Sequence, residues 1–162
     1  MKKKSKVFLI VMILILFFFT YKIIDYNKVF QLSDVIFDYI EDYRFTRVTI
    51  YSPDYSSDKK ITENIYNTKD EKLIKEIYDY LSSLELKKNF KDFDYVNNIT
   101  IYTVDDKKNI VSIDLQPETN NVYISIRPNG KKSNKFKQYR IVGESYNFQD
   151  INSFIEKMTL VQ

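Results

Sequence analysis

The sequence predicts an α+β fold, in which an N-terminal transmembrane helix precedes a small domain with a mostly antiparallel sheet covered by a central and a C-terminal helix. Three observations lead to this prediction. An unbroken apolar run follows a lysine-rich start. Further along, helical spacing of apolar residues gives way to strict alternation. The last strand-like segments are joined by turns that are too short for parallel crossovers.

The apolar run from Val7 to Phe19 predicts a membrane anchor over 7–24. At 1.5 Å per residue this helix is about 27 Å long, close to the ~30 Å hydrocarbon core of a bilayer. Tyr21 stands where an interfacial aromatic belt is expected, and Ile24 closes the span. A cleaved secretory signal is the competing interpretation, but the residues after Phe19 lack the small side chains that cleavage needs.

The net charge of +3 lies in the N-terminal tail. Subtracting the four lysines of segment 1–6 and Lys22 from the 25 basic residues leaves 20, against 22 acidic ones, so 25–162 carries a formal charge of −2. Because basic flanks stay on the cytoplasmic side, 1–6 is predicted to be a cytoplasmic stub. Lys, Ile, Asn and Tyr dominate the composition, as in AT-rich bacteria, which predicts a cell-membrane protein with its domain on the wall side of a Gram-positive cell.

The first exported segment, 25–44, is predicted to form a juxtamembrane amphipathic helix. Its apolar residues recur at spacings of three and four, with acidic residues between them; they are Val29, Leu32, Ile36, Ile40 and Tyr43. The α+β domain is predicted over 45–162. It starts with an alternating strand that ends before Pro53, and a second alternation from Ile61 to Tyr66 indicates one more strand.

A capped helix comes next, from about Lys69 to Leu84. Thr68 and Glu71 match a capping box, in which each side chain accepts a bond from a backbone N–H of the first turn. Leu73, Ile77 and the other apolar residues of this segment follow helical spacing and form a stripe wide enough to cover a sheet. The stretch from Lys87 to Asp94 is basic and irregular.

Four strand-like segments then predict an antiparallel meander. Their apolar residues alternate with polar ones around Ile101, Ile113, Ile124 and Ile141, and turn-forming residues separate the segments. A last helix is predicted at about 148–157. The sheet is therefore expected to contain the four-strand meander plus one or two strands.

The composition excludes several classes of enzyme. The chain has no His and no Cys, which excludes histidine-based triads, thiol nucleophiles and the usual zinc sites, and two glycines cannot build a phosphate-binding loop. The remaining catalytic material is two carboxylate pairs, Asp92 with Asp94 and Asp105 with Asp106. They lack the spacing of a calcium loop, and the second pair lies in an expected turn. The sequence therefore predicts no catalytic residues, no metal site and no cofactor.

Two further patterns have a binding and a structural interpretation. The basic cluster of the exported domain is a candidate contact for anionic lipid or wall polymer, or else protects an edge strand from pairing; it comprises Lys131, Lys132, Lys135 and Lys137. The tyrosines Tyr102, Tyr123 and Tyr139 alternate with isoleucines, which favours cross-strand packing over sugar stacking. Nucleic acid is not expected as a partner because the domain is acidic overall.

The order of these elements resembles a loosely defined family of small extracytoplasmic proteins of Gram-positive bacteria that are anchored by a membrane helix or by a lipid. The similarity covers about 45–142 and rests on the strand entry at Ile61-Thr62, the capped helix ending in Tyr80-Leu81, the strand Ile99 to Tyr102 and the strand Tyr139-Arg140-Ile141. The resemblance implies an extracytoplasmic domain and supplies no catalytic residues. This chain has no cysteine for a lipid anchor, which leaves the helix as its tether.

These observations together predict a single-pass membrane protein whose outer domain binds or senses something at the cell surface without catalysis. The lipid bilayer is its expected partner through the N-terminal helix, and a membrane protein or a wall polymer is the expected partner of the domain. The alternative is an accessory or self-protection protein, similar in role to immunity proteins, that acts through a membrane partner. The sequence leaves the oligomeric state open.

Overall fold

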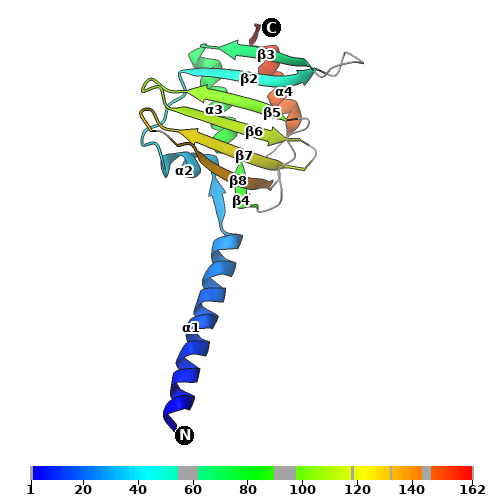
Figure 1. Cartoon of the computed structure of the whole chain (residues 1–162). Helices are drawn as coiled ribbons and strands as arrows, with labels where there is room; N and C mark the ends of the chain where they lie inside the picture. The colour runs from blue at the N-terminus through cyan, green and yellow to red at the C-terminus, as the bar shows by residue number, and fades with distance from the viewer. Residues whose placement is uncertain are drawn as a thin grey trace.

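The computed structural model describes residues 2–54, 62–89, 98–117, 119–131, 133–143 and 147–161. A long helix, α1 (Lys2–Asn27), leads into a domain of strands and shorter helices (Figure 1). The shorter helices are α2 (Leu32–Phe37), α3 (Glu71–Ser82) and α4 (Phe148–Glu156). The strands are β1 (Val29–Gln31), β2 (Arg47–Asp54), β3 (Thr62–Thr68), β4 (Glu85–Lys88), β5 (Ile99–Val104), β6 (Ile110–Gln116), β7 (Asn121–Arg127), β8 (Lys135–Val142) and β9 (Thr159–Leu160).

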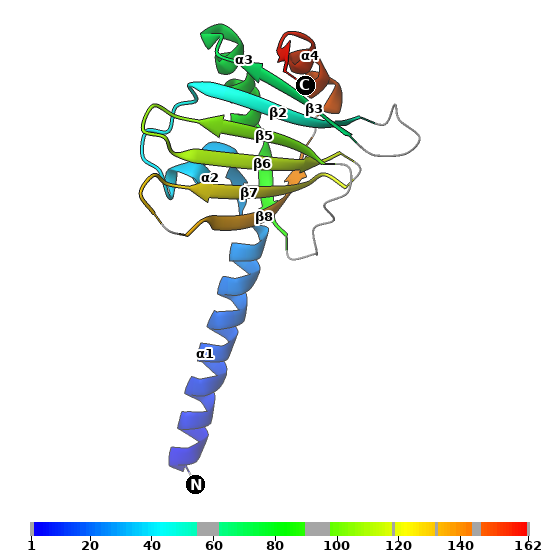
Figure 2. The ribbon, with the colours of Figure 1, turned by 45° about the horizontal axis from the view of Figure 1, so that its top comes forward.

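Within these described ranges the strands form one nine-stranded sheet in the order β1-β4-β8-β7-β6-β5-β2-β3-β9. All neighbouring strands run antiparallel. The helices α3 and α4 lie behind the sheet, and the opposite face is open (Figures 1 and 2). Alternation sets this arrangement: on β6, Val111, Ile113 and Leu115 are fully buried against the helices, whereas the residues between them face the open side. The predicted α+β class and the four-strand meander, β5 to β8, are confirmed.

The helix α1 stands apart from the core. Its apolar side chains between Val7 and Ile24 are 42% to 70% exposed, and Val7–Asn27 is long and apolar enough to cross a membrane. One residue, Lys28, separates α1 from β1, and Lys88 Nζ lies 2.7 and 2.6 Å from the two carboxylate oxygens of Asp25. The first residue of the core cluster is Leu32, so α1 is attached to the domain without contributing to its core.

The sheet is larger than the five or six strands predicted. The additional strands are β1, β4 and β9. Part of the stretch predicted to be irregular from Lys87 onward belongs to β4, which pairs with β8 on one side and with β1 on the other. These strands are short and lie in the outer parts of the sheet. They have no clear alternating pattern of their own and form because they pair with a neighbouring strand. The predicted strand entry at Ile61 lies outside the described residues.

The single helix predicted over 25–44 is wrong. The chain leaves α1 at Asn27, forms β1, and resumes a helix for the six residues of α2 before turning through Tyr39 to Asp42. The apolar spacing nevertheless identifies the residues of the core, since Leu32, Ile36, Ile40 and Tyr43 are all at most 5% exposed. Val29 is the exception, because it is 44% exposed. It belongs to β1, which pairs with the edge of β4, and its side chain lies on the open side of the sheet.

The N-cap of helix α3 lies two residues later than its sequence motif indicates. Asp70, not Thr68, is the N-cap residue, and its carboxylate accepts from the backbone N–H of Leu73 at 3.0 Å. The Thr68 hydroxyl accepts from the N–H of Asp70 instead, at 3.1 Å. An aspartate between the two members of a capping box can take over the cap, because its carboxylate is a preferred N-cap acceptor.

Replacing the observed cap tests this assignment. We expect Asp70→Ala to lower the free energy of unfolding of the domain by about 1 kcal/mol, because the N–H of Leu73 then loses its acceptor. Glu71→Ala should cost only a few tenths of a kcal/mol, through its interaction with the helix dipole. Urea unfolding followed by circular dichroism measures both free energies. Equal losses for the two variants would contradict Asp70 as the N-cap residue and would support the predicted capping box of Thr68 and Glu71.

Candidate binding cavity

The basic residues predicted to contact an anionic surface are spread along one hairpin. Lys131 is exposed in the turn between β7 and β8, and Lys135 and Lys137 are exposed on β8. The ammonium group of Lys137 lies 5.6 Å from the centroid of the Tyr39 ring. Lys132 lies outside the described residues. The structure therefore brings Lys135 and Lys137 to one side of a strand, but it does not form a pocket from these three lysines.

The carboxylate pairs do not assemble into a site among the described residues. Asp105 is buried and accepts from the backbone N–H and the side-chain Nδ2 of Asn109, at 2.7 and 2.6 Å, so its carboxylate closes the turn between β5 and β6. Asp106 is exposed in that turn. Asp92 and Asp94 lie outside the described part of the chain. Within that part, no group of three or more acidic side chains is placed to hold a metal ion.

The three singled-out tyrosines lie on both faces of the sheet. Tyr139 is buried under the helices, its ring packs edge-on against Phe30, and burial raises its pKa to about 12. Tyr123 stacks on Phe136 on the open face, with ring centroids 5.6 Å apart. The Tyr102 hydroxyl accepts from Arg127 at 3.3 Å. The Tyr123–Phe136 stack joins the neighbouring strands β7 and β8, as the expected cross-strand packing requires. The contacts of Tyr139 and Tyr102 instead reach the second strand away.

Asp114 on β6 places a partly buried carboxylate on the open face. It accepts from the Thr100 hydroxyl at 2.7 Å and from the Ser112 hydroxyl at 3.4 Å, and its cross-strand neighbour on β7 is Tyr123. Burial raises the pKa of Asp114, against the two hydrogen bonds, which lower it. The fold therefore disfavours the ionised form of this side chain at neutral pH.

This direction predicts a pH-dependent gain from Asp114→Asn. Because the unfolded chain ionises Asp114 more easily than the fold does, the carboxylate destabilises the domain above its ordinary pKa. We expect the variant to have a higher unfolding free energy than the natural chain at pH 7. The gain should vanish at pH 3, where both states are protonated. Urea unfolding at the two pH values measures it, with Asp106→Asn as an unchanged control; a loss at pH 7 would contradict the prediction.

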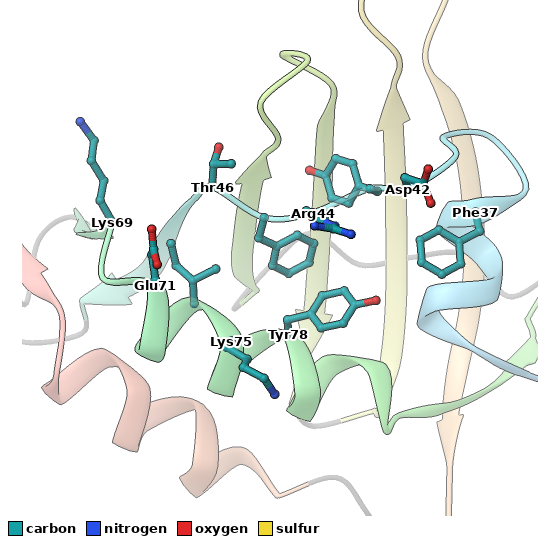
Figure 3. A pocket seen from close by; sticks show the side chains of 11 residues that line it. Phe37, Asp42, Arg44, Thr46, Lys69, Glu71, Lys75 and Tyr78 are labelled. Carbon is teal, nitrogen blue, oxygen red and sulfur yellow. The ribbon is translucent and has the colours of Figure 1, made fainter.

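A cavity of about 720 Å³ opens between the chain that follows α2 and the first turns of α3. Figure 3 shows Lys69 and Glu71 at one end, Phe37 and Asp42 at the other, and Tyr78 between them. The full lining comprises Phe37, Asp42, Tyr43, Arg44, Phe45, Thr46, Lys69, Glu71, Ile74, Lys75 and Tyr78. The two sides of the cavity are thus distant in the sequence and meet because α3 packs behind the sheet.

A chain of three aromatic rings lies along the cavity. Phe45 packs edge-on against Tyr43 and Tyr78, with ring centroids 5.4 and 5.1 Å apart. Thr46 fixes the start of β2, since both its backbone N–H and its hydroxyl bond to the carbonyl of Val104, at 2.8 and 3.0 Å. The rings of Tyr43, Phe45 and Tyr78 therefore form the aromatic part of the lining, at the edge of the core.

The hydroxyl of Tyr43 is a structural group. It lies 2.8 Å from the Thr103 hydroxyl, which donates to the Val111 carbonyl at 3.1 Å, so Tyr43 is the donor in the first bond. Burial raises the pKa of Tyr43 well above its usual value. A tyrosine held in its neutral form in this way anchors the wall of the cavity and does not act as a base.

The charges around the cavity are of both signs. Arg44 and Lys69 are basic, Asp42 and Glu71 are acidic, and none of these four takes part in an ion pair within the described residues. Lys75 is already paired with Asp79 on the next turn of α3. The formal charge available to a ligand is therefore balanced, with aromatic rings between the charged ends. Such a lining suits a ligand with both charges and an apolar part.

Sequence reasoning missed this cavity. Tyr43 counts as an apolar residue of the helix predicted over 25–44, and Phe45 stands at the start of the predicted domain, so the sequence assigns both to elements and not to a site. Tyr78 lies outside the apolar stripe predicted for the capped helix. A signal was present in the four consecutive bulky residues Tyr43 to Thr46 at an element boundary, but nothing in the sequence indicates that α3 folds against them.

The chain was compared with protein-family models, curated proteins and solved structures, and no match was found in any of the three comparisons.

Proposed function

We propose that this chain is a single-pass membrane protein with a cytoplasmic N-terminus, and that its extracytoplasmic domain binds a segment of a partner polypeptide without catalysing a reaction. The binding site in this proposal is the cavity between α3 and the chain after α2. The bilayer is the partner of α1.

The exposure of α1 is the observation that carries the proposal. A helix whose apolar side chains are 42% to 70% exposed from Val7 to Ile24 would be poorly soluble in water. In a bilayer the same surface is solvated by lipid, and Val7–Asn27 spans about 31 Å at 1.5 Å per residue. The lysines that precede Val7 favour a cytoplasmic N-terminus.

The balanced charge of the cavity favours a polypeptide over an anionic wall polymer. A polymer of repeated phosphates would gain from Arg44 and Lys69 but would meet Asp42 and Glu71 in the same space. A peptide segment can place an acidic side chain at Arg44 or Lys69 and a basic one at Asp42 or Glu71. An apolar side chain of the same segment can then pack on the rings of Phe45 and Tyr78. This preference also favours the accessory role, in which the protein acts through a membrane partner, over polymer binding.

The membrane topology can be tested with single cysteines, since the natural chain has none. Asn152→Cys lies on an exposed position of α4, and Ser5→Cys lies in the N-terminal stub. In intact cells, a membrane-impermeant maleimide should label the first and not the second. Labelling of Ser5→Cys alone would show that the orientation is the opposite of the proposed one. A mature N-terminus between Thr20 and Ser33 would identify a cleaved signal.

The cavity can be tested by site-specific photocrosslinking in living cells. Phe37 is 44% exposed at the cavity and Phe136 is 55% exposed on the open face, so a benzoylphenylalanine at each position gives a matched pair. We expect a discrete polypeptide adduct from position 37 alone, and its loss in Arg44→Glu but not in Arg47→Glu, because Arg47 lies on β2 outside the cavity. Polymer adducts, or identical adducts from both positions, would overturn the proposed ligand.

A further inference from the structure

A second hollow, of about 540 Å³, lies where α1 meets the domain. Its lining comprises Tyr26, Lys87, Lys88, Asn89, Thr119, Asn121, Arg140 and Val142, which come from the end of α1, from β4, and from β7, β8 and the turn before β7. Three of these residues are cationic and none is acidic. Lys88 is neutralised by Asp25 of α1, so Lys87 and Arg140 carry the charge that is left.

Lys87 and Arg140 are direct cross-strand partners on β4 and β8. Like charges directly opposite each other destabilise an antiparallel pair, with Cβ atoms about 5 Å apart. Neither has an ion-pair partner in the part of the chain that the structure describes. The nearby carboxylate of Glu85 lies over Gly143, where its Oε2 is 3.2 Å from the position of an added Cβ. Glu118 and Glu144 lie outside the described residues.

The floor of the hollow is a network of amides. Asn89 Nδ2 donates to Asn121 Oδ1 at 2.7 Å, and Asn121 Nδ2 donates to Gln116 Oε1 at 3.3 Å. The hydroxyl of Thr119 donates to the same Gln116 oxygen at 2.6 Å. Asn121 is the cross-strand partner of Arg140 on β7, so the network holds the strand beside the two cations. The cations therefore stand on a fixed polar surface.

The position of the hollow along α1 indicates where its ligand comes from. Tyr26 lines it and lies at the end of the membrane-length segment Val7–Asn27. An aromatic residue at this position of a spanning helix is typical of the headgroup layer. The hydrogen bonds from Lys88 to Asp25 hold β4 beside the end of α1. Lys87 and Arg140 are therefore held close to the end of the membrane-length segment. Figure 1 shows β4 and β8 as the part of the sheet next to α1.

We infer that Lys87 and Arg140 bind the phosphate of an anionic lipid headgroup in the leaflet on the domain side of the membrane. The inference rests on the proposed membrane insertion of α1. The chemistry recognised is a phosphate, which an arginine guanidinium can bind through two parallel N–H···O bonds and a lysine as a point charge. The like charges that oppose each other across the two strands are then neutralised by the ligand.

The test uses the full chain in nanodiscs that contain phosphatidylcholine with or without phosphatidylglycerol. Native mass spectrometry after gentle release counts the phosphatidylglycerol molecules that stay on the protein. We expect Lys87→Gln/Arg140→Gln to weaken this retention about thirtyfold, at about fivefold for each basic residue near an anionic surface. The matched control, Lys72→Gln/Lys107→Gln, removes the same charge from two exposed positions and should retain the lipid as the natural chain does.

Three outcomes would overturn the inference: equal retention by the two double variants, equal retention of phosphatidylcholine and phosphatidylglycerol by the natural chain, and displacement of the lipid by inorganic phosphate at equal concentration. The last outcome would identify a site for free phosphate. Failure of the proposed function is distinguishable, because a chain whose α1 does not enter a bilayer would not co-purify with nanodiscs of either composition.

Discussion

Two lysines in the middle of α1, in the variant Ile13→Lys/Leu16→Lys, are expected to release the protein from the membrane fraction. A charged residue at the centre of a spanning helix costs about 2.5 to 3.5 kcal/mol on the insertion scale, so the pair costs about 5 to 7 kcal/mol. Both side chains are exposed in the structure, at 44% and 60%, so the substitutions leave the domain core untouched. Fractionation of cells followed by an alkaline carbonate wash measures the result.

The matched control places the two lysines on the domain. Asn152→Lys/Ser153→Lys adds the same charge at exposed positions of α4 and should leave the protein in the membrane pellet. If the α1 variant stayed in the pellet after the carbonate wash, α1 would not be the anchor. N-terminal sequencing of both variants excludes release by cleavage.

The largest expected loss of domain stability comes from the contact between α3 and the sheet. Ile77 is 0% exposed in the middle of α3. The substitution Ile77→Ala removes three carbon atoms from the core and leaves a cavity between α3 and the sheet. Substitutions of this kind cost about 2 to 5 kcal/mol, which is a large share of the ~5 to 15 kcal/mol that a domain has in total. We expect a lower urea midpoint with an unchanged slope.

The measurement can use 28–162, because the core cluster starts at Leu32 and contains no residue of α1. The chain has no Trp, so circular dichroism or tyrosine fluorescence reports unfolding. Lys72→Ala on the exposed side of the same helix should change the unfolding free energy by less than about 0.5 kcal/mol. A similar loss for both variants would mean that α3 is not packed through Ile77.

The elements that the sequence predicts well are those with a long period of their own. Alternation over six or more residues identifies β5 to β8, and the stripe that contains Ile77 identifies α3. The strand β4, by contrast, reads Glu85-Leu86-Lys87-Lys88 and contains one apolar residue. Its place in the sheet comes from pairing with β8 and β1, which is tertiary information.

The two candidate sites show the same limit. Arg44 and Tyr78 become neighbours only when α3 crosses behind the sheet, and Lys87 and Arg140 only when β4 pairs with β8. The lysines around Lys135 are close along the chain and therefore predict a charge cluster, whereas the structure spreads them along a hairpin. Residue spacing predicts which side chains share an element, whereas a site built from several elements depends on their packing.

The short connection between α1 and the sheet limits how far the domain can reach. One residue, Lys28, joins them, and the Asp25–Lys88 bonds brace the joint, so the domain has no flexible tether. Nine strands spaced ~4.8 Å apart rise about 40 Å from β1 to β9. The end of the cavity at Thr46 lies next to the start of β2, six strand spacings or about 30 Å from β1 along the sheet, whereas the end at Phe37 belongs to α2, which follows β1 directly. Under the proposed insertion of α1, a partner polypeptide would have to present its segment within a few nanometres of the bilayer, as a short loop of a neighbouring membrane protein does.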